Sequence, residues 1–249
     1  MRMKNPFIPI QKVRAVIIDG RAHEDIINTL IKFNIRVIKT IKCEEVYDAI
    51  SYHPDIVIHP IDYQTLIIAP NVYDYYKDML KNASLKLIKG EKKLKRNYPE
   101  NIAYNVARVS HYAIHNFKYT DEKLKYYLEK KGIEFINVKQ GYSKCSTCIV
   151  SDNAIITSDP SIYKECKKYF IDALFINSGY IDLPGLNYGF IGGATGFISD
   201  MQLAFTGEYQ HHPNFLDINI FLKKYRKKPV ILSSKKIIDV GSIIPLVYN

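Results

Sequence analysis

The sequence has no Trp, only four Cys and four Met, and no long apolar run. Four Cys in 249 residues do not suggest a disulfide scaffold, and the modest Gly and Pro content excludes collagen-like and low-complexity classes. Pro6 and Pro9 interrupt the apolar residues of the basic N-terminal stretch. That stretch is therefore too short for a signal peptide core or a membrane span. We expect a cytoplasmic protein without membrane contact.

The composition is that of a globular protein with a basic charge. Hydrophobic residues make up 47% of the chain, which is enough for a full core. Lys and Arg number 35 against 25 Asp and Glu, a net charge of +10 that fits a nucleic acid or ribosome partner. The abundance of Ile, Lys and Asn is also typical of A+T-rich coding. The basic stretches 86–96 and 223–228 lack aromatic stacking patterns, so this partner is weakly indicated.

A unit of strand, turn, strand, helix and strand recurs along the chain. Its turn residues Asp62, Arg108, Asp152 and Asp200 are spaced by 46, 44 and 48 residues. The N-terminal unit lacks its first strand, which a lone strand at 242–248 can supply by pairing with 13–18. The pattern predicts an α/β fold, a single domain over 1–249 built as a five-unit ββαβ ring with helices outside. Its units span about 13–45 with the closing strand 242–248, 46–90, 98–140, 141–184 and 185–236. Closure by the C-terminal strand onto the N-terminal unit removes exposed sheet edges.

This architecture resembles the pentein superfamily, the β/α-propeller of guanidine-group-modifying enzymes, which also includes a non-catalytic ribosome anti-association factor. The segments GYSKCSTCIVSDNAIITSD and LPGLNYGFIGGATGFISD resemble a clostridial-type branch of it. The resemblance implies a catalytic Cys on the closing strand, a His at the start of the fourth unit and acids that hold a guanidinium. Here the closing strand has no Cys, and Lys144 and Cys145 stand where the His is implied.

Strand alternation selects the residues that face the predicted central pore. Counting back from the turns puts Asp55, Asn101 and Cys145 in one ring, with Asn105 on the same face. If Asn249 holds the turn position of the closing unit, Ser242 completes this ring. A thiol beside carboxylates at a concave mouth has the composition of a nucleophilic site.

Two short motifs are given structural interpretations. Cys148 follows Cys145 by three residues on a predicted strand, so the two thiols point apart, and we expect no metal site and no cofactor. GFIGGATG lacks the ending of a phosphate loop, and we expect Gly192, Gly193 and Gly196 to permit close backbone approach at the axis.

The loops after the second strands are predicted to reach the same rim as Cys145. They carry further candidate residues, several of which could equally serve as helix caps: His115, Asp159, Glu208, His211 and His212. Pro213, just after His212, is the predicted first residue of a helix.

Two functions follow from this pattern. In the first, Cys145 is the nucleophile of a hydrolase or transferase, His212 or His115 carries the proton, and Asp55 or Asp159 holds a small polar or cationic ligand of guanidine or amidine type. The remaining ligand-binding candidates are Asn101, Asn105, Glu208 and His211. In the alternative, the protein is a non-catalytic binding module for ribosome, RNA or protein.

Overall fold

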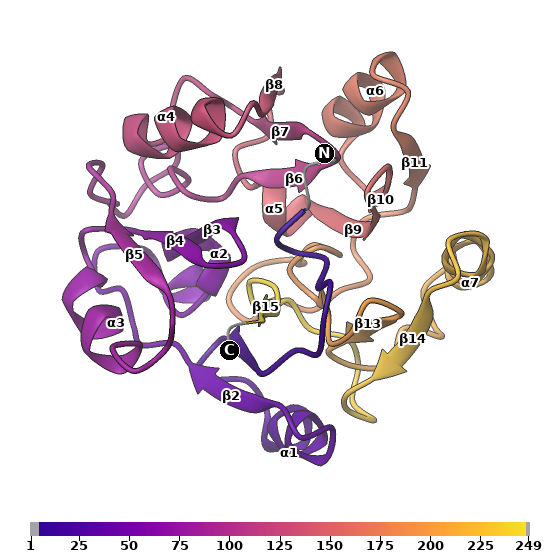
Figure 1. The fold of residues 1–249 in the computed structure, drawn as a ribbon. Helices are drawn as coiled ribbons and strands as arrows, with labels where there is room; N and C mark the ends of the chain where they lie inside the picture. Colours follow the sequence, from indigo (N-terminus) through magenta and orange to yellow (C-terminus); the bar gives the residue numbers. More distant parts are fainter. Residues whose placement is uncertain (1–4, 248–249) are drawn as a thin grey trace.

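The computed structural model describes residues 5–247, which form five three-stranded sheets and seven α-helices. Figure 1 shows the sheets around a common centre, with the longer helices at the periphery. Residues 1–4 of the predicted domain, and Tyr248 and Asn249 of its closing segment, lie outside the described residues. Within 5–247, each helix is too short or too polar to cross a bilayer.

Each sheet has its own peripheral helix, and the five sets follow in chain order. The first sheet holds β15 (Ile244–Leu246), β1 (Ala15–Ile18) and β2 (Arg36–Lys39) with α1 (Glu24–Lys32). The second holds β3 (Ile58–Asp62), β4 (Thr65–Ile68) and β5 (Lys86–Lys89) with α3 (Tyr73–Met79). The third holds β6 (Ala107–Val109), β7 (Tyr112–His115) and β8 (Glu134–Asn137) with α4 (Glu122–Lys130). The fourth holds β9 (Thr147–Ser151), β10 (Ala154–Thr157) and β11 (Asp172–Phe175) with α6 (Pro160–Lys168). The fifth holds β12 (Thr195–Phe197), β13 (Gln202–Phe205) and β14 (Lys228–Ile231) with α7 (Phe215–Lys224).

All five sheets share one pairing pattern. The middle strand pairs antiparallel with one neighbour and parallel with the strand that follows its helix. As predicted, the C-terminal strand β15 pairs with β1, with Val16 opposite Pro245. The sheets are separate from one another, so closure of the ring and the exact unit boundaries stay predictions.

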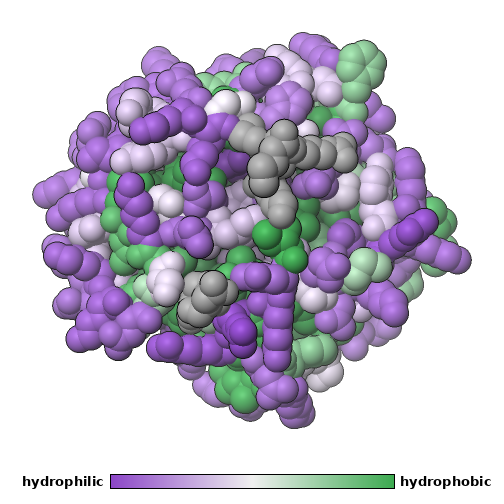
Figure 2. Space-filling view, viewed as in Figure 1, coloured by the Kyte–Doolittle hydropathy of each residue, from purple (hydrophilic) through white to green (hydrophobic). Residues whose placement is uncertain are grey.

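Burial follows from the position of each strand in its sheet. Middle strands are almost entirely buried because a helix covers one face and the centre of the molecule covers the other. The last strand of each unit lies outermost and exposes its ends; in β5, for example, Ile88 is the buried residue. Hydrophilic residues accordingly dominate the face seen in Figure 2, with smaller apolar patches between them.

The local structure differs from the prediction at the start of two units. The first hairpin strands were expected to begin near Asp55 and Cys145, but a turn of helix precedes each strand: η1 (Asp48–Ile50) and α2 (Pro54–Val57) before β3, and α5 (Ser143–Ser146) before β9. Pro54 favours this turn because its fixed φ suits the first helical position. Asp55 and Cys145 therefore lie on helical turns, where strand alternation does not apply.

We predict that deleting residues 242–249 destabilises the protein by more than ~3 kcal/mol. Ile244 and Leu246 are almost fully buried, and each such side chain contributes about 1.5–3 kcal/mol. Thermal and urea unfolding measure the loss, with Phe170→Ser as a control because Phe170 is 89% exposed. A truncated chain that unfolds like the intact one would show that the closing strand is not required.

Candidate active site

The thiol of Cys145 lies on α5 against the carboxylate of Asp55 on α2. Cys145 Sγ is 3.2 Å from both Asp55 oxygens, and Asn105 Nδ2 donates to the same sulfur at 3.1 Å. Asn105 Oδ1 also accepts from the backbone N–H groups of Lys144 and Cys145, so its side chain fixes the start of α5. The structure thus brings together three residues that the sequence placed on one face.

A chain of hydrogen bonds continues from Asp55 to a buried ammonium. Ser242 Oγ donates to Asp55 Oδ2 at 2.6 Å, and Lys144 Nζ donates to Ser242 Oγ at 2.8 Å. Ser242 has a left-handed backbone with φ 74° and follows Gly241 at φ 64°. Such a conformation is uncommon for Ser and is maintained here by the contact with Asp55. Cys145, Asp55, Ser242 and Lys144 thus form one buried series of hydrogen-bonded side chains.

His53 lies beside this series and was not among the residues selected from the sequence. Its ring is almost fully buried, and neither ring nitrogen has a hydrogen-bond partner. Nε2 is 3.8 Å from Asp19 Oδ2, and Nδ1 is 3.9 Å from Asp239 Oδ1. One feature of the sequence could have indicated His53. This residue directly precedes Pro54 and Asp55, so it lies close to the candidate residue Asp55.

One group of side chains at this site has the types and spacing of metal ligands. His53, Asp55 and Cys145 each offer one ligand atom, and these atoms lie within 4.8 Å of one another. Imidazole, carboxylate and thiolate are all ligands of Zn²⁺ in proteins. These three residues could therefore hold a metal ion, and Cys148, on β9 (Thr147–Ser151), is not one of the group.

A cavity of about 250 Å³ leads to Cys145, His53 and Asp239. These three residues are at most 3% exposed and form its inner part, whereas Leu186 and Tyr188 are 49% and 41% exposed and lie at its outer edge. The cavity gives a small ligand access from solvent to the thiol.

Close backbone packing at the cavity base requires glycine, as the sequence indicated. A Cβ on Gly192 would lie 2.3 Å from the carbonyl oxygens of Lys144 and Thr147. One on Gly193 would lie 1.9 Å from Asp239 Oδ1. Any side chain at these positions would displace the α5 segment or the Asp239 carboxylate.

Burial and like charges shape the ionisation of the site. Burial, and then the neighbouring Asp55 and Asp239 carboxylates, hold the pKa of the Cys145 thiol well above its ordinary value. Burial also raises the pKa of Asp239 and lowers the pKa of Lys144, which Asp55 opposes. In the free protein, Cys145 is therefore a neutral thiol that donates its hydrogen to Asp55.

Asn101 reaches the cavity only through a neighbour. It accepts a hydrogen bond from Tyr142 Oη at 2.9 Å and donates to the Arg96 carbonyl. Tyr142 lines the cavity and also contacts Tyr47 Oη at 3.2 Å. Asn101 thus orients the wall residue Tyr142. The place beside the thiol, where Asn101 was expected, is taken by Asn105.

His115 lies outside the residues that line the cavity. Both its ring nitrogens are used, one at 2.6 Å from Thr120 Oγ1 and the other at 2.8 Å from the Gly141 carbonyl. Burial lowers the pKa of His115 to about 4. This geometry joins two loops and leaves no ring nitrogen available to Cys145.

His212 also bonds to the backbone. Its Nε2 lies 3.1 Å from the Asn177 carbonyl, and its Nδ1 accepts from the Asn214 N–H. The helix expected to start at Pro213 begins at Phe215, so His212 stabilises the preceding turn. His211 is exposed at the same turn.

The two acidic candidates from the loops also have structural partners. Asp159 accepts from the Ile162 N–H as the N-cap of α6 and from Gln140 Nε2. Glu208 pairs through its backbone with Lys235 and Ile237. Neither residue lines the cavity at Cys145.

Comparison with known proteins finds one family and several solved structures of similar fold. The family described as Family of unknown function (DUF6873) matches residues 17–244. No curated protein matches the chain. An amidinotransferase from Microseira wollei in the saxitoxin biosynthetic pathway is 12% identical with a TM-score of 0.59, over 93% of this chain and 91% of that one. DDAH from Pseudomonas aeruginosa in complex with citrulline is 10% identical with a TM-score of 0.58, over 90% of this chain and 93% of that one.

A third similar structure is agmatine deiminase from C. jejuni. It is 11% identical with a TM-score of 0.55, over 89% of this chain and 88% of that one. At these identities the likeness shows the fold alone, which this chain shares with the three proteins.

We predict that serine destabilises the protein more at Cys148 than at Cys145. Cys148 belongs to an apolar cluster, so Cys148→Ser should cost about 1–3 kcal/mol of unfolding free energy. Cys145→Ser keeps a donor to Asp55 and should cost less than ~1 kcal/mol. Urea unfolding of both variants measures this, and a larger loss for Cys145→Ser would contradict the assignment of Cys145 to a polar site.

His115 should make the protein less stable in acid. Because the folded pKa of about 4 lies below the ordinary 6.5, the unfolded chain binds the proton more readily. The contribution is complete above pH 6.5 and is lost as pH falls toward 4, by about 3 kcal/mol. His115→Gln should flatten the pH dependence of urea unfolding by this amount, and a His211→Gln control at an exposed position should not. Parallel curves for His115→Gln and the unmodified protein would refute it.

Proposed function

Since the chain belongs to the family of unknown function (DUF6873), which spans residues 17–244, we propose its activity from its own site. It is a pentein-type hydrolase or transferase in which Cys145 attacks a guanidine or amidine carbon. The observation that carries this proposal is the thiol of Cys145 in contact with the Asp55 carboxylate at the base of a cavity. The narrower resemblance to a clostridial-type branch stays a prediction.

The charges at the cavity base favour a cationic ligand. Asp239 is a buried carboxylate of the cavity lining, and Asp55 is a second one that contacts the lining residue Cys145. Lys144 is the buried ammonium that offsets Asp55 through Ser242. A planar guanidinium or amidinium presents several N–H donors and pairs well with carboxylates. Binding such a cation beside Cys145 neutralises the excess negative charge.

The same binding step activates the nucleophile. The carboxylates that favour the neutral thiol of Cys145 lose this effect when a cation pairs with them. The thiol proton then passes to His53, whose ring nitrogens are unpartnered. The thiolate forms only when substrate is present, which protects it from adventitious oxidation.

The reaction that follows uses His53 as proton carrier. The thiolate adds to the central carbon, and the amine leaves with a proton from His53, giving a covalent intermediate on Cys145. Water then attacks this carbon and regenerates the thiol in a hydrolase. An acceptor amine attacks instead in a transferase.

The solved neighbours support this class of chemistry through their fold. They are an amidinotransferase, DDAH and an agmatine deiminase. This chain departs from the pattern that the superfamily resemblance implies, because Ser242 stands on the closing segment and Cys145 opens the fourth unit. The hydrogen bond of each to Asp55 supports an equivalent centre with the nucleophile on another unit.

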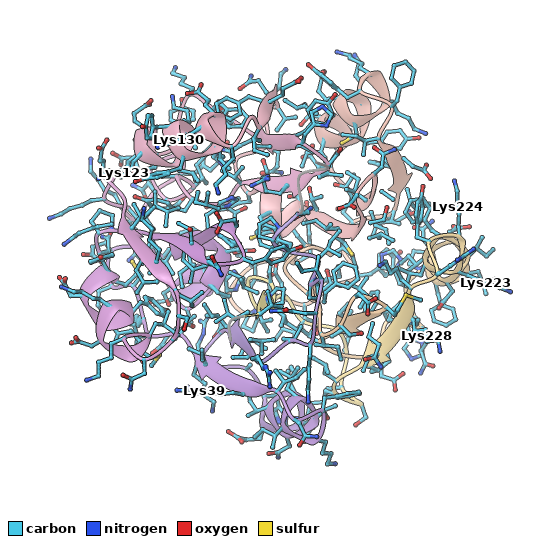
Figure 3. All side chains as sticks on the ribbon, viewed as in Figure 1. Lys39, Lys123, Lys130, Lys223, Lys224 and Lys228 are labelled. Atoms are coloured by element: carbon cyan, nitrogen blue, oxygen red, sulfur yellow. The ribbon has the colours of Figure 1, made fainter. Side chains whose placement is uncertain are left out.

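The alternative from the sequence is non-catalytic binding to RNA, ribosome or protein through basic surfaces. Lys223, Lys224 and Lys228 lie together on α7 and β14, and Lys39, Lys123 and Lys130 lie elsewhere on the periphery in Figure 3. Several of these lysines pair with local carboxylates, as Lys224 does with Asp172. We favour the enzyme, acting in the cytoplasm, where the four free thiols would stay reduced.

Alkylation by matched reagents tests the proposal. 2-Chloroacetamidine carries an amidinium, whereas 2-chloroacetamide is neutral and similar in size. We expect the cationic reagent to modify Cys145 at least ~10-fold faster, a preference of about 1.4 kcal/mol. Mass spectrometry of peptides locates the adduct and gives the rates.

Two variants make this result specific. Asp55→Asn should abolish the preference for the cation, and Cys43→Ala, which removes a buried thiol elsewhere, should leave it unchanged. Equal rates with both reagents, or modification confined to other cysteines, would refute the enzyme and favour a binding module.

A further inference from the structure

The walls of the Cys145 cavity are far less polar than its base, and this contrast defines a substrate class. Resting on the proposed function, we infer that the substrate carries its guanidinium or amidinium on an apolar or aromatic tail and lacks a carboxylate. Arginine-like amino acids are therefore excluded as good substrates.

The apolar walls are built from residues far apart in the sequence. Besides Tyr142 and the amide of Asn187, they comprise aliphatic side chains and aromatic rings: Ile50, Leu183, Leu186, Tyr47, Tyr188 and Phe190. Each square ångström of apolar ligand surface buried against them contributes about 25 cal/mol. A ligand tail of alkyl or aryl type is the group that gains from this surface.

The outer part of the cavity presents apolar surface to solvent. Leu186 is 49% exposed and Tyr188 41% exposed, both on the segment that follows Gly185. Exposed large apolar residues gathered at a cavity entrance are typical of ligand-binding surfaces. They lie where the tail of a ligand would leave the base of the cavity.

A ligand carboxylate finds no complementary charge in this cavity. The ionisable residues of its lining, tyrosines apart, are His53, Cys145 and Asp239. Arg21 lies next to the adjoining cavity, but its guanidinium is engaged by Asp19 at 2.7 Å and by the carbonyls of Asp48 and Ala49. A ligand carboxylate near Asp239 would be repelled by it and would lose its hydration without gaining a cationic partner.

The size of the cavity limits the tail. Its volume of about 250 Å³ lies below the ~300–1,000 Å³ of sites for drug-sized ligands. A single ring or a short alkyl chain with its cationic head fits this volume.

Calorimetric titration of the Cys145→Ala protein with matched probes tests the inference without turnover. Butylguanidine and L-arginine share the guanidinium and differ mainly in the amino acid group, and benzamidine and benzamide differ in charge. We expect butylguanidine to bind at least ~10-fold more tightly than L-arginine, and benzamidine at least ~10-fold more tightly than benzamide. Tighter or equal binding of L-arginine would overturn the inference, as would failure of all four probes to bind.

Variants separate the apolar walls from the charged base. Leu186→Ser should weaken benzamidine and butylguanidine at least ~3-fold and leave methylguanidine, which has no tail, unchanged. Leu216→Ser is the matched control, because Leu216 is 71% exposed on α7 and lies outside the cavity lining. If both variants change the affinity for benzamidine and butylguanidine equally, the apolar walls do not bind the ligand tail.

The two proposals fail separately. If L-arginine binds best while 2-chloroacetamidine still modifies Cys145 selectively, the substrate class is wrong and the enzyme stands. If Cys145 is unreactive while apolar amidines bind as expected, the cavity binds such cations without catalysis.

Discussion

The buried carboxylate of Asp55 is the constraint on which the centre of the molecule depends. Asp55 is only 1% exposed, and a charge removed from water needs donors around it. The thiol of Cys145 and the hydroxyl of Ser242 supply them, while the backbone of Asp55 bonds to the Gly241 carbonyl and to Asn105 Nδ2. Four segments distant in sequence are thereby held at one point, and the last of them arrives only with the closing strand.

The balance of charged side chains around Asp55 determines which charge a ligand of the site can carry. Lys144 offsets Asp55 through Ser242, and Arg21 engages Asp19, so Asp239 is the carboxylate without a strong cationic partner. His53 lies at nearly equal distances from the carboxylates of Asp19 and Asp239. The inner end of the cavity thus holds one carboxylate in excess, Asp239, and one imidazole without hydrogen bonds, His53. Such a site suits a cation that can also exchange a proton.

The sequence predicted the five sheets because each unit is a local structure. A hairpin, a helix and a returning strand need a nearly constant length, so the turns recur even where side chains differ. The site was predicted in part, because Cys145, Asp55 and Ser242 hold equivalent positions at the starts of their units. The alternation used to select them was wrong locally, since α2 and α5 are helical turns.

The histidines could not be assigned from the sequence, because their roles depend on tertiary contacts. His115 and His212 follow second strands, as the rim residues were expected to do, yet backbone carbonyls at Gly141 and Asn177 engage their rings. His53 reaches the centre through the packing of Gly241 against it, where a Cβ would lie 2.2 Å from His53 Cβ. That contact joins segments almost two hundred residues apart and leaves no local pattern.

The repeated architecture also explains how the Cys145 thiol of the fourth unit meets the same carboxylate as the closing segment. Asp55, Cys145 and Ser242 lie near the starts of three different units and meet at one point, whereas Asn101 of the third unit bonds to Tyr142 instead. In this chain the closing segment delivers a hydroxyl and the fourth unit a thiol, and both reach the same carboxylate.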